Sequence, residues 1–175
     1  NCLSCHTPHA SKKAGLLADR EHPFFGTKEC TKCHGKTGAP GAQNLARPAT
    51  ALSASCHEIP KRKPGAKGVT ASGHVHPPVA KGDCVACHTP HASDRASLLV
   101  TQAMRLCVQC HPRAVADARL KHGHPPAASG ECATCHEPHE SANSALLKQK
   151  AGALCFTCHK ELQTRLAQGK PHAPV

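Results

Sequence analysis

Large apolar side chains are scarce in this sequence. Its 175 residues include no Trp, no Tyr, one Met and three Phe. Such side chains carry much of the apolar surface that a folded domain buries. At about 25 cal/mol per Å² of buried surface, Ala, Val and Leu alone do not offset the ordering entropy of the chain. The 15 Pro and 13 Gly also interrupt long helices and strands. A group other than protein is therefore expected to supply the core.

Long hydrophobic runs and acidic residues are also few. No apolar run approaches the ~20 residues of a membrane span, so we expect a soluble chain. Lys and Arg number 22 against 11 Asp and Glu, which gives a formal charge of +11. This balance favours nucleic acid as a partner, but aromatic stacking residues are almost absent and the charges are scattered. We therefore expect no nucleic acid, and we interpret the basic cluster at 61–63 and Lys67 as a solvated linker.

Cysteine and histidine, in contrast, are abundant, with 13 Cys and 16 His. The motif Cys-x-x-Cys-His occurs six times, at 2–6, 30–34, 84–88, 107–111, 132–136 and 155–159. Segments 74–93 and 122–141 match at a period of 48 residues, and within each repeat the second motif begins 23 residues after the first. Such a period indicates one repetitive domain over 1–175. Its parts are a leading motif (1–21) and three paired blocks (22–73, 74–121 and 122–175).

The block at 22–73 is degenerate. His22-Pro23 precedes Cys30 by the same eight residues as in the other blocks, and Ser53 stands 23 residues after Cys30. Ser53 is followed by Cys56 and His57, so this motif has lost its first Cys and kept the other two residues. Six pairs and Cys56 account for the odd cysteine count. Because the chain begins inside a motif, any export signal is expected to have been removed or left out.

Cys-x-x-Cys-His is the attachment signature of c-type haem, in which two thiols form thioethers and the His ligates iron. Disulfides and zinc sites are the alternatives, but neither explains why a His follows every Cys pair. The sequence predicts seven haems c, six at full motifs and one through a single thioether at Cys56. The expected thioether residues are Cys2, Cys5, Cys30, Cys33, Cys56, Cys84, Cys87, Cys107, Cys110, Cys132, Cys135, Cys155 and Cys158. The expected proximal ligands are His6, His34, His57, His88, His111, His136 and His159.

Two recurring contexts supply seven distal candidates. These are Cys-His-x-Pro-His (His9, His91 and His139) and His before Pro or its equivalent (His22, His76, His124 and His172). His74 and His122 stay uncertain, because they either contact propionates or the surface or replace the His two residues on. His91 follows His88 too closely to reach the opposite face of the same haem, so His9, His91 and His139 are expected to ligate neighbouring haems. Bis-His iron has no open position, which favours electron transfer and leaves no catalytic residue to assign.

Regular structure is expected to be sparse. We predict mostly coil with four to six short α-helices around the haems and no significant sheet. Leu at helical spacing predicts helices over 96–108 and 144–156. Pro112 favours a helix over 113–121, and Gly169 ends one predicted over 159–168.

The pattern Cys-His-x-Pro-His…Leu-Leu…Cys-x-x-Cys-His, which extends from Cys2 to His172, resembles the doubled-motif multihaem c-type cytochromes of bacteria and archaea. That family includes periplasmic carriers, decahaem conduits and extracellular filaments. The resemblance implies closely spaced, low-potential bis-His haems in an exported protein, extracellular or periplasmic, with redox proteins or extracellular acceptors as partners. The roles it leaves open are long-range transport through a cytochrome filament, or nanowire, a soluble periplasmic shuttle, and an electron-donor domain of a multihaem reductase.

Two departures bear on these roles. Thr37 stands where the other blocks have a distal His, whereas His172 has no haem motif after it. His172 is expected either to fold back or to ligate a haem of the next copy, and a head-to-tail contact of that kind builds an open filament. A reductase needs an iron without a distal ligand, often with Lys as the proximal residue. Cys-x-x-Cys-Lys is absent, so the chain is not expected to be an enzyme.

Overall fold

The computed structural model describes residues 6, 7, 9, 11–35, 45–58, 69, 70 and 73–169. Cys2, Cys5, His172 and the predicted linker cluster lie outside the described residues. The chain forms two compact units, which are described separately below. The first comprises Asn1–Ile59 and Pro77–Gly130, and the second comprises Pro60–His76 and Glu131–Val175.

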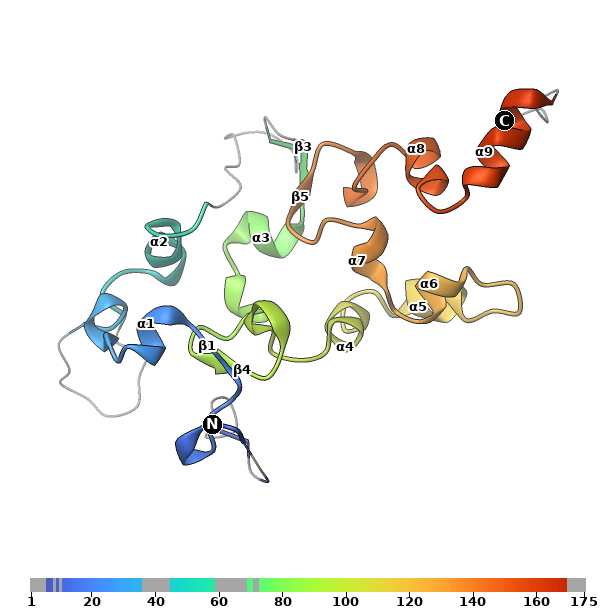
Figure 1. Cartoon of the computed structure of the whole chain (residues 1–175). Coiled ribbons are helices and arrows are strands. Elements are labelled where there is room, and N and C mark those ends of the chain that lie inside the picture. Colours follow the sequence, from blue (N-terminus) through green and yellow to red (C-terminus); the bar gives the residue numbers. More distant parts are fainter. Residues whose placement is uncertain are drawn as a thin grey trace. The chain divides into compact units, whose positions relative to one another are not determined.

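The first unit contains short helices and one two-stranded ribbon (Figure 1). Its α-helices are α1 (Pro23–Gly26), α2 (Ala49–Ala54), α3 (Pro77–Lys81), α4 (Ala103–Val108), α5 (Pro112–Ala118) and α6 (Pro125–Ala128). Its 3-10 turns are η2 (Ala14–Leu16), η3 (Cys30–Lys32), η4 (Cys84–Ala86) and η5 (Ala96–Leu98). Proline opens α1, α5 and α6, where its missing N–H costs no helical hydrogen bond. These prolines follow a motif His or a distal candidate, so they start helices directly after expected ligands.

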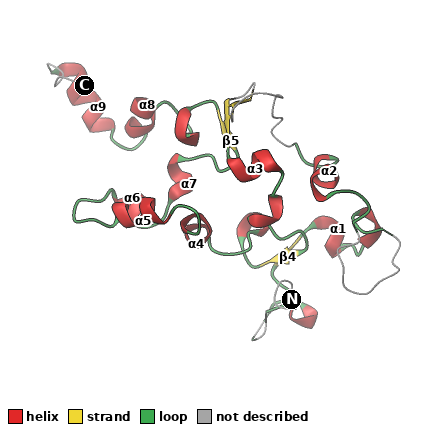
Figure 2. Cartoon of the chain, turned by 180° about the vertical axis from the view of Figure 1, so that it is seen from behind, coloured by secondary structure: helices red, strands yellow, loops and turns green. Residues whose placement is uncertain are grey.

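The second unit is built in the same way. Its elements are β2 (Val69–Thr70), β3 (Gly73–Val75), α7 (Cys132–Cys135), β5 (Glu140–Ser141), η6 (Ser144–Leu146), α8 (Ala151–Phe156) and α9 (Lys160–Gln168). Within the described part of the chain, coil predominates over nine short α-helices and no large sheet forms (Figure 2). The predicted fold class is therefore confirmed, although the helices are more numerous than the four to six expected.

Two small antiparallel sheets are the main feature that the sequence did not predict. In the first unit β1 pairs with β4 (Arg20–Glu21 and Ala92–Ser93), with Glu21 opposite Ala92. In the second unit β3 pairs with β5, with Val75 opposite Glu140, and β2 pairs with the other edge of β3. Each sheet joins a strand directly before a His-Pro sequence to a strand directly after Cys-His-x-Pro-His. The pairing is long-range, so no local alternation of residues reveals it.

The predicted helices over 96–108 and 144–156 are too long. Helix formation begins only at Ala103 and at Ala151, after an extended segment. Upstream of each, Ser97 and Ala145 have positive φ angles of 54° and 53°, which an α-helix cannot contain. The helices predicted at 113–121 and 159–168 form as α5 and α9, and α9 ends before Gly169.

The described residues bury almost no large side chain. The buried apolar residues are Ala18, Val75, Ala92 and Val115, with 0–8% of their surface exposed, and no large side chain among the described residues is fully buried. Burial of a few small side chains stabilises a fold weakly. This agrees with the expectation that the polypeptide does not supply its own core. Separately, none of the described helices is both long and apolar enough to cross a membrane.

Candidate haem-binding site

The Cys-x-x-Cys-His segments share one backbone turn. In each described copy the His N–H donates to the carbonyl of the first Cys, at 2.9 Å for His34 and His111 and 3.0 Å for His88, His136 and His159. The turn brings the two Cys and the His, spread over five residues, into one compact loop. None of the eleven described cysteines forms a disulfide, and their side chains are exposed or half-buried. Burial raises the pKa of the Cys87 thiol, and Asp83 acts in the same direction.

The degenerate motif keeps this turn without its first thiol. The N–H groups of Cys56 and His57 donate to the Ser53 carbonyl at 3.1 and 2.9 Å, and the matching bonds to Cys107 measure 3.2 and 2.9 Å. Ser53 is also the fifth residue of the six-residue helix α2, as Cys107 is of α4 and Cys155 is of α8. The segment ending at His57 is therefore built as the second motif of a pair, in the same register.

The leading motif and the first motif of each paired block are followed by a different structure, a β-bridge from the motif His to a Leu eleven residues on. The four bridges join His6 to Leu17, His34 to Leu45, His88 to Leu99 and His136 to Leu147. In three copies the His Nδ1 also lies close to the carbonyl nine residues on, at 2.7 Å for His6 and His88 and 2.8 Å for His136. A carbonyl only accepts, so Nδ1 carries the proton and Nε2 is left to bind metal.

Two expected proximal ligands of the first unit face distal candidates. The ring centroids of His34 and His91 are 5.8 Å apart, and the two ring planes are inclined by 29°. The rings of His57 and His22 have centroids 6.0 Å apart and meet at 69°. Two imidazoles that bind one metal ion from opposite sides, with metal–nitrogen bonds of about 2 Å, have ring centres roughly 6 Å apart. The separations in both pairs match that requirement.

The β1–β4 ribbon holds the two distal candidates of these pairs together. The strands β1 and β4 lie side by side (Figure 1). The His22 N–H donates to the His91 carbonyl at 2.7 Å, directly beside the Glu21–Ala92 register. Phe25 lies against His91, with ring centroids 5.2 Å apart. Burial lowers the pKa of both His22 and His91, and neighbouring imidazoles lower it further. Both side chains are thus favoured in the neutral form that metal ligation requires.

The other distal candidates occupy equivalent or peripheral positions. In the second unit the His76 N–H donates to the His139 carbonyl at 2.8 Å, which repeats the His22–His91 link. His74 lies in β3 opposite Ser141. His9, His122 and His124 are exposed. The ring pairs in the first unit therefore bring together four of the predicted ligands.

An open cavity of about 540 Å³ lies in the first unit and is lined by His6, His88 and His91, among others. Cofactor pockets generally measure about 300–1,000 Å³. Four features together fit covalently bound haem: free thiols at fixed spacing, pairs of facing imidazoles, this cavity and the lack of a side-chain core among the described residues. The residues present are therefore those that a haem c requires.

The site and the coil-rich fold define a multihaem c-type cytochrome, a class of electron-transfer protein. The family model described as "Doubled CXXCH motif" matches residues 1–21, 22–61, 76–116 and 124–164, and the chain belongs to this family. No curated protein and no solved structure matches the chain. The prediction of c-type haem and of electron transfer is confirmed at this level.

Sequence reasoning missed the residues that support three of the motifs, those ending at His6, His88 and His136. These are Ser11, Ser93 and Ser141 and the carbonyl-bearing residues Gly15, Ser97 and Ala145. A signal was available, because Ser recurs five residues after the motif His and Leu-Leu recurs ten and eleven residues after it. The spacing of the Leu pair predicts a helix face, whereas its second Leu pairs with the motif His in a β-bridge and closes the loop between them.

Proposed function

We propose that this cytochrome carries electrons through seven bis-His c-type haems and has no catalytic site. The ring pairs His34–His91 and His22–His57 carry this proposal, because their centroids are separated as two axial ligands of one iron are. Haem c supplies a reversible one-electron couple when bound. The residues of the chain hold each haem through thioethers and occupy both axial positions, which excludes substrate from the iron.

The assignment of His91 to the haem of Cys30 and Cys33 rests on three contacts. The His91 ring centroid lies 5.8 Å from that of His34, its backbone carbonyl accepts from the His22 N–H, and Phe25 packs against its ring. Its own motif ends at His88, so His91 is a ligand supplied by one block to the haem of another. A shared ligand of this kind fixes the spacing of neighbouring haems, which electron transfer through a chain requires.

The seventh haem, at Cys56, is supported by two independent features. Ser53 accepts the same backbone hydrogen bonds as the first Cys of a full motif. His22 stands beside His57 at the separation of an axial pair. A haem at this position needs only the Cys56 thioether and these two imidazoles.

The remaining ligands follow the predicted sets. The proximal ligands are His6, His34, His57, His88, His111, His136 and His159. The distal ligands are His9, His22, His76, His91, His124, His139 and His172. His74 and His122 either contact propionates or the surface or replace the His two residues on. The backbone bond from His76 to His139 repeats the bond from His22 to His91. This supports the same ligand role for the His-Pro and the Cys-His-x-Pro-His histidines in both places.

We further propose that the protein is exported, to the periplasm or the cell exterior, and passes electrons to redox proteins or extracellular acceptors. Supporting this, covalent haem proteins of this family are typically exported. A head-to-tail filament in which His172 ligates a haem of the next copy accounts for Thr37 at the position of a distal His. A soluble periplasmic shuttle is the alternative, and His172→Ala distinguishes them. Loss of assembly supports the filament, and unchanged assembly with unchanged haem spectra contradicts it.

Carbon monoxide titration of the fully reduced protein tests the bis-His proposal. Carbon monoxide binds a ferrous haem only where an axial position is open. We expect no spectral change at stoichiometric carbon monoxide. Binding by one or more haem equivalents would contradict the proposal and reopen a catalytic role.

A further inference from the structure

The structure contains a repeated left-handed turn that meets the Nδ1 atom of three motif histidines. His6 Nδ1 lies 2.7 Å from the Gly15 carbonyl oxygen, His88 Nδ1 lies 2.7 Å from that of Ser97, and His136 Nδ1 lies 2.8 Å from that of Ala145. The spacing is nine residues in each case, although Gly, Ser and Ala occupy the acceptor position. The backbone, and not the side chain, is therefore the shared feature.

The acceptor residue and the Leu after it both adopt a left-handed conformation. The φ angles are 72° and 56° at Gly15 and Leu16, 54° and 53° at Ser97 and Leu98, and 53° and 56° at Ala145 and Leu146. A Leu, Ser or Ala side chain rarely adopts this region, because Cβ crowds the backbone. Of the six described non-glycine residues with positive φ, five lie in these turns. Strain that recurs at one position in the three turns that the structure describes points to a role for the turn.

Three consecutive carbonyl groups of the turn each accept one hydrogen bond from the motif side of the loop. In the block at 74–121, Ser97 accepts from His88 Nδ1, Leu98 accepts from the Thr89 N–H at 2.8 Å, and Leu99 accepts from Ser93 Oγ at 2.7 Å. Ser93 Oγ in turn accepts from the Arg95 N–H at 3.0 Å. Hydrogen bonds at Arg95, before Ser97, and at Leu98 and Leu99, after it, thus hold the Ser97 carbonyl in place.

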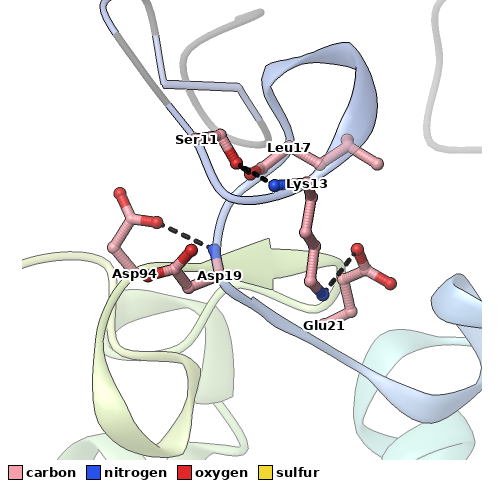
Figure 3. A network of polar contacts seen from close by, with 6 residues as sticks. All are labelled: Ser11, Lys13, Leu17, Asp19, Glu21 and Asp94. Carbon is pink, nitrogen blue, oxygen red and sulfur yellow. Dashed lines mark hydrogen bonds and ion pairs between the residues drawn. The ribbon is translucent and has the colours of Figure 1, made fainter.

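The same set of bonds recurs in the other two copies. The Ser11 Oγ donates to the Leu17 carbonyl and accepts from the Lys13 N–H (Figure 3). The Thr7 N–H donates to the Leu16 carbonyl. In the second unit, the Ser141 Oγ donates to the Leu147 carbonyl and the Glu137 N–H donates to that of Leu146. In the first copy, Lys13 also forms an ion pair with Glu21 at 2.9 Å, which ties the loop to β1 (Figure 3).

We propose that this turn is a positioning device that sets the orientation and the reduction potential of the haems at the motifs ending at His6, His88 and His136. The inference rests on the proposed ligation of iron by His6, His88 and His136. Donation from Nδ1 to the carbonyl fixes the tautomer and the ring plane, and it makes Nε2 a stronger base. A stronger base stabilises ferric over ferrous iron, so the turn lowers the potential of these haems.

Ser97→Val and Ser97→Gly form a matched test in the full-length holoprotein. A β-branched side chain disfavours φ of +54°, so Val displaces the carbonyl, whereas Gly accepts that conformation without strain. Spectroelectrochemical titration measures the potentials, and the mass of the denatured protein shows that every haem is attached. We expect one haem equivalent of Ser97→Val to move to higher potential and Ser97→Gly to titrate as the unsubstituted protein. A tenfold change in the ferric-to-ferrous ratio corresponds to a shift of about 59 mV for a one-electron couple.

An unchanged titration curve for Ser97→Val, or the same shift for Ser97→Gly, would overturn the inference. If Ser97→Val loses a haem, Ser93→Ala replaces it, because that change removes the Oγ bonds to the Leu99 carbonyl and from the Arg95 N–H and leaves Ser97 itself unchanged. Its haem equivalent is also expected to rise in potential, and an unchanged curve there overturns the inference. Carbon monoxide binding by the unsubstituted protein would refute bis-His ligation and leave this test intact, since the turn acts on the proximal His.

Discussion

The imidazole ring of His57 lies edge-on to that of His22, with centroids 6.0 Å apart, beside a motif that has lost its first cysteine. His57 is held by the turn that Ser53 closes, and His22 is held by its N–H bond to the His91 carbonyl. The two rings thus come from separate elements, and each is fixed by its own backbone contacts. A haem at Cys56, ligated by both rings, accounts for the two arrangements together.

Replacement of His22 by Ala is expected to open one axial position at the Cys56 haem. One haem equivalent of the reduced variant then binds carbon monoxide, measured by optical titration. Added imidazole is the control, because it fills the vacated position and restores the spectrum of the unsubstituted protein. No carbon monoxide binding by His22→Ala would show that His22 is not the ligand.

His91→Ala is expected to open an axial position at the haem attached at Cys30 and Cys33, because the His91 ring centroid lies 5.8 Å from that of His34. The double variant with His22→Ala should bind two equivalents of carbon monoxide, one at each haem. The backbone bond between His22 and His91 does not depend on either side chain, so both variants retain it. A single equivalent in the double variant would mean that the two histidines serve the same haem.

The haem-free chain is expected to lack cooperative unfolding. Ala92 is fully buried and Ala18, Val75 and Val115 nearly so, but no described large side chain is. Such a small buried surface does not offset backbone ordering. Thermal unfolding followed by circular dichroism should show a broad, shallow change without haem and a sharp transition with it. A sharp transition in the haem-free chain would refute the account of the core.

Gly82→Ala and Gly152→Ala are expected to change stability in opposite directions. Gly82 has φ of +73°, and an added Cβ would lie 2.5 Å from Thr50 Oγ1, whose hydroxyl donates to the Gly82 carbonyl at 3.1 Å. This change should destabilise the holoprotein by about 1–3 kcal/mol. Gly152 lies in α8 with no atom within 4 Å of an added Cβ, so Ala should stabilise it by roughly 0.5–1 kcal/mol. Thermal midpoints of the two variants test this, and destabilisation of both would contradict it.

The motif turns could be predicted from sequence because each is local. The bond from His34 to Cys30 spans five residues whose identity defines the motif. The distal context of His91 indicated a neighbouring haem, but the pairing with His34 depends on a ribbon that joins Glu21 to Ala92 across much of the chain. The helix predicted through Leu98 and Leu99 was wrong for a different reason. The left-handed turn at Ser97, which is stabilised by the hydrogen bond from His88 Nδ1, prevents a helix although the Leu spacing favours one.

The intact mass of the denatured protein tests the central claim most directly, because only covalently attached haem survives denaturation. We expect seven haem increments, falling to six in Cys56→Ser. Cys107→Ser is the matched control, since Cys110 retains one thioether there and the turn resembles that of Ser53, so its count should stay at seven. Six increments in the unsubstituted protein would contradict the account, because Cys56 would then hold no haem by a covalent bond.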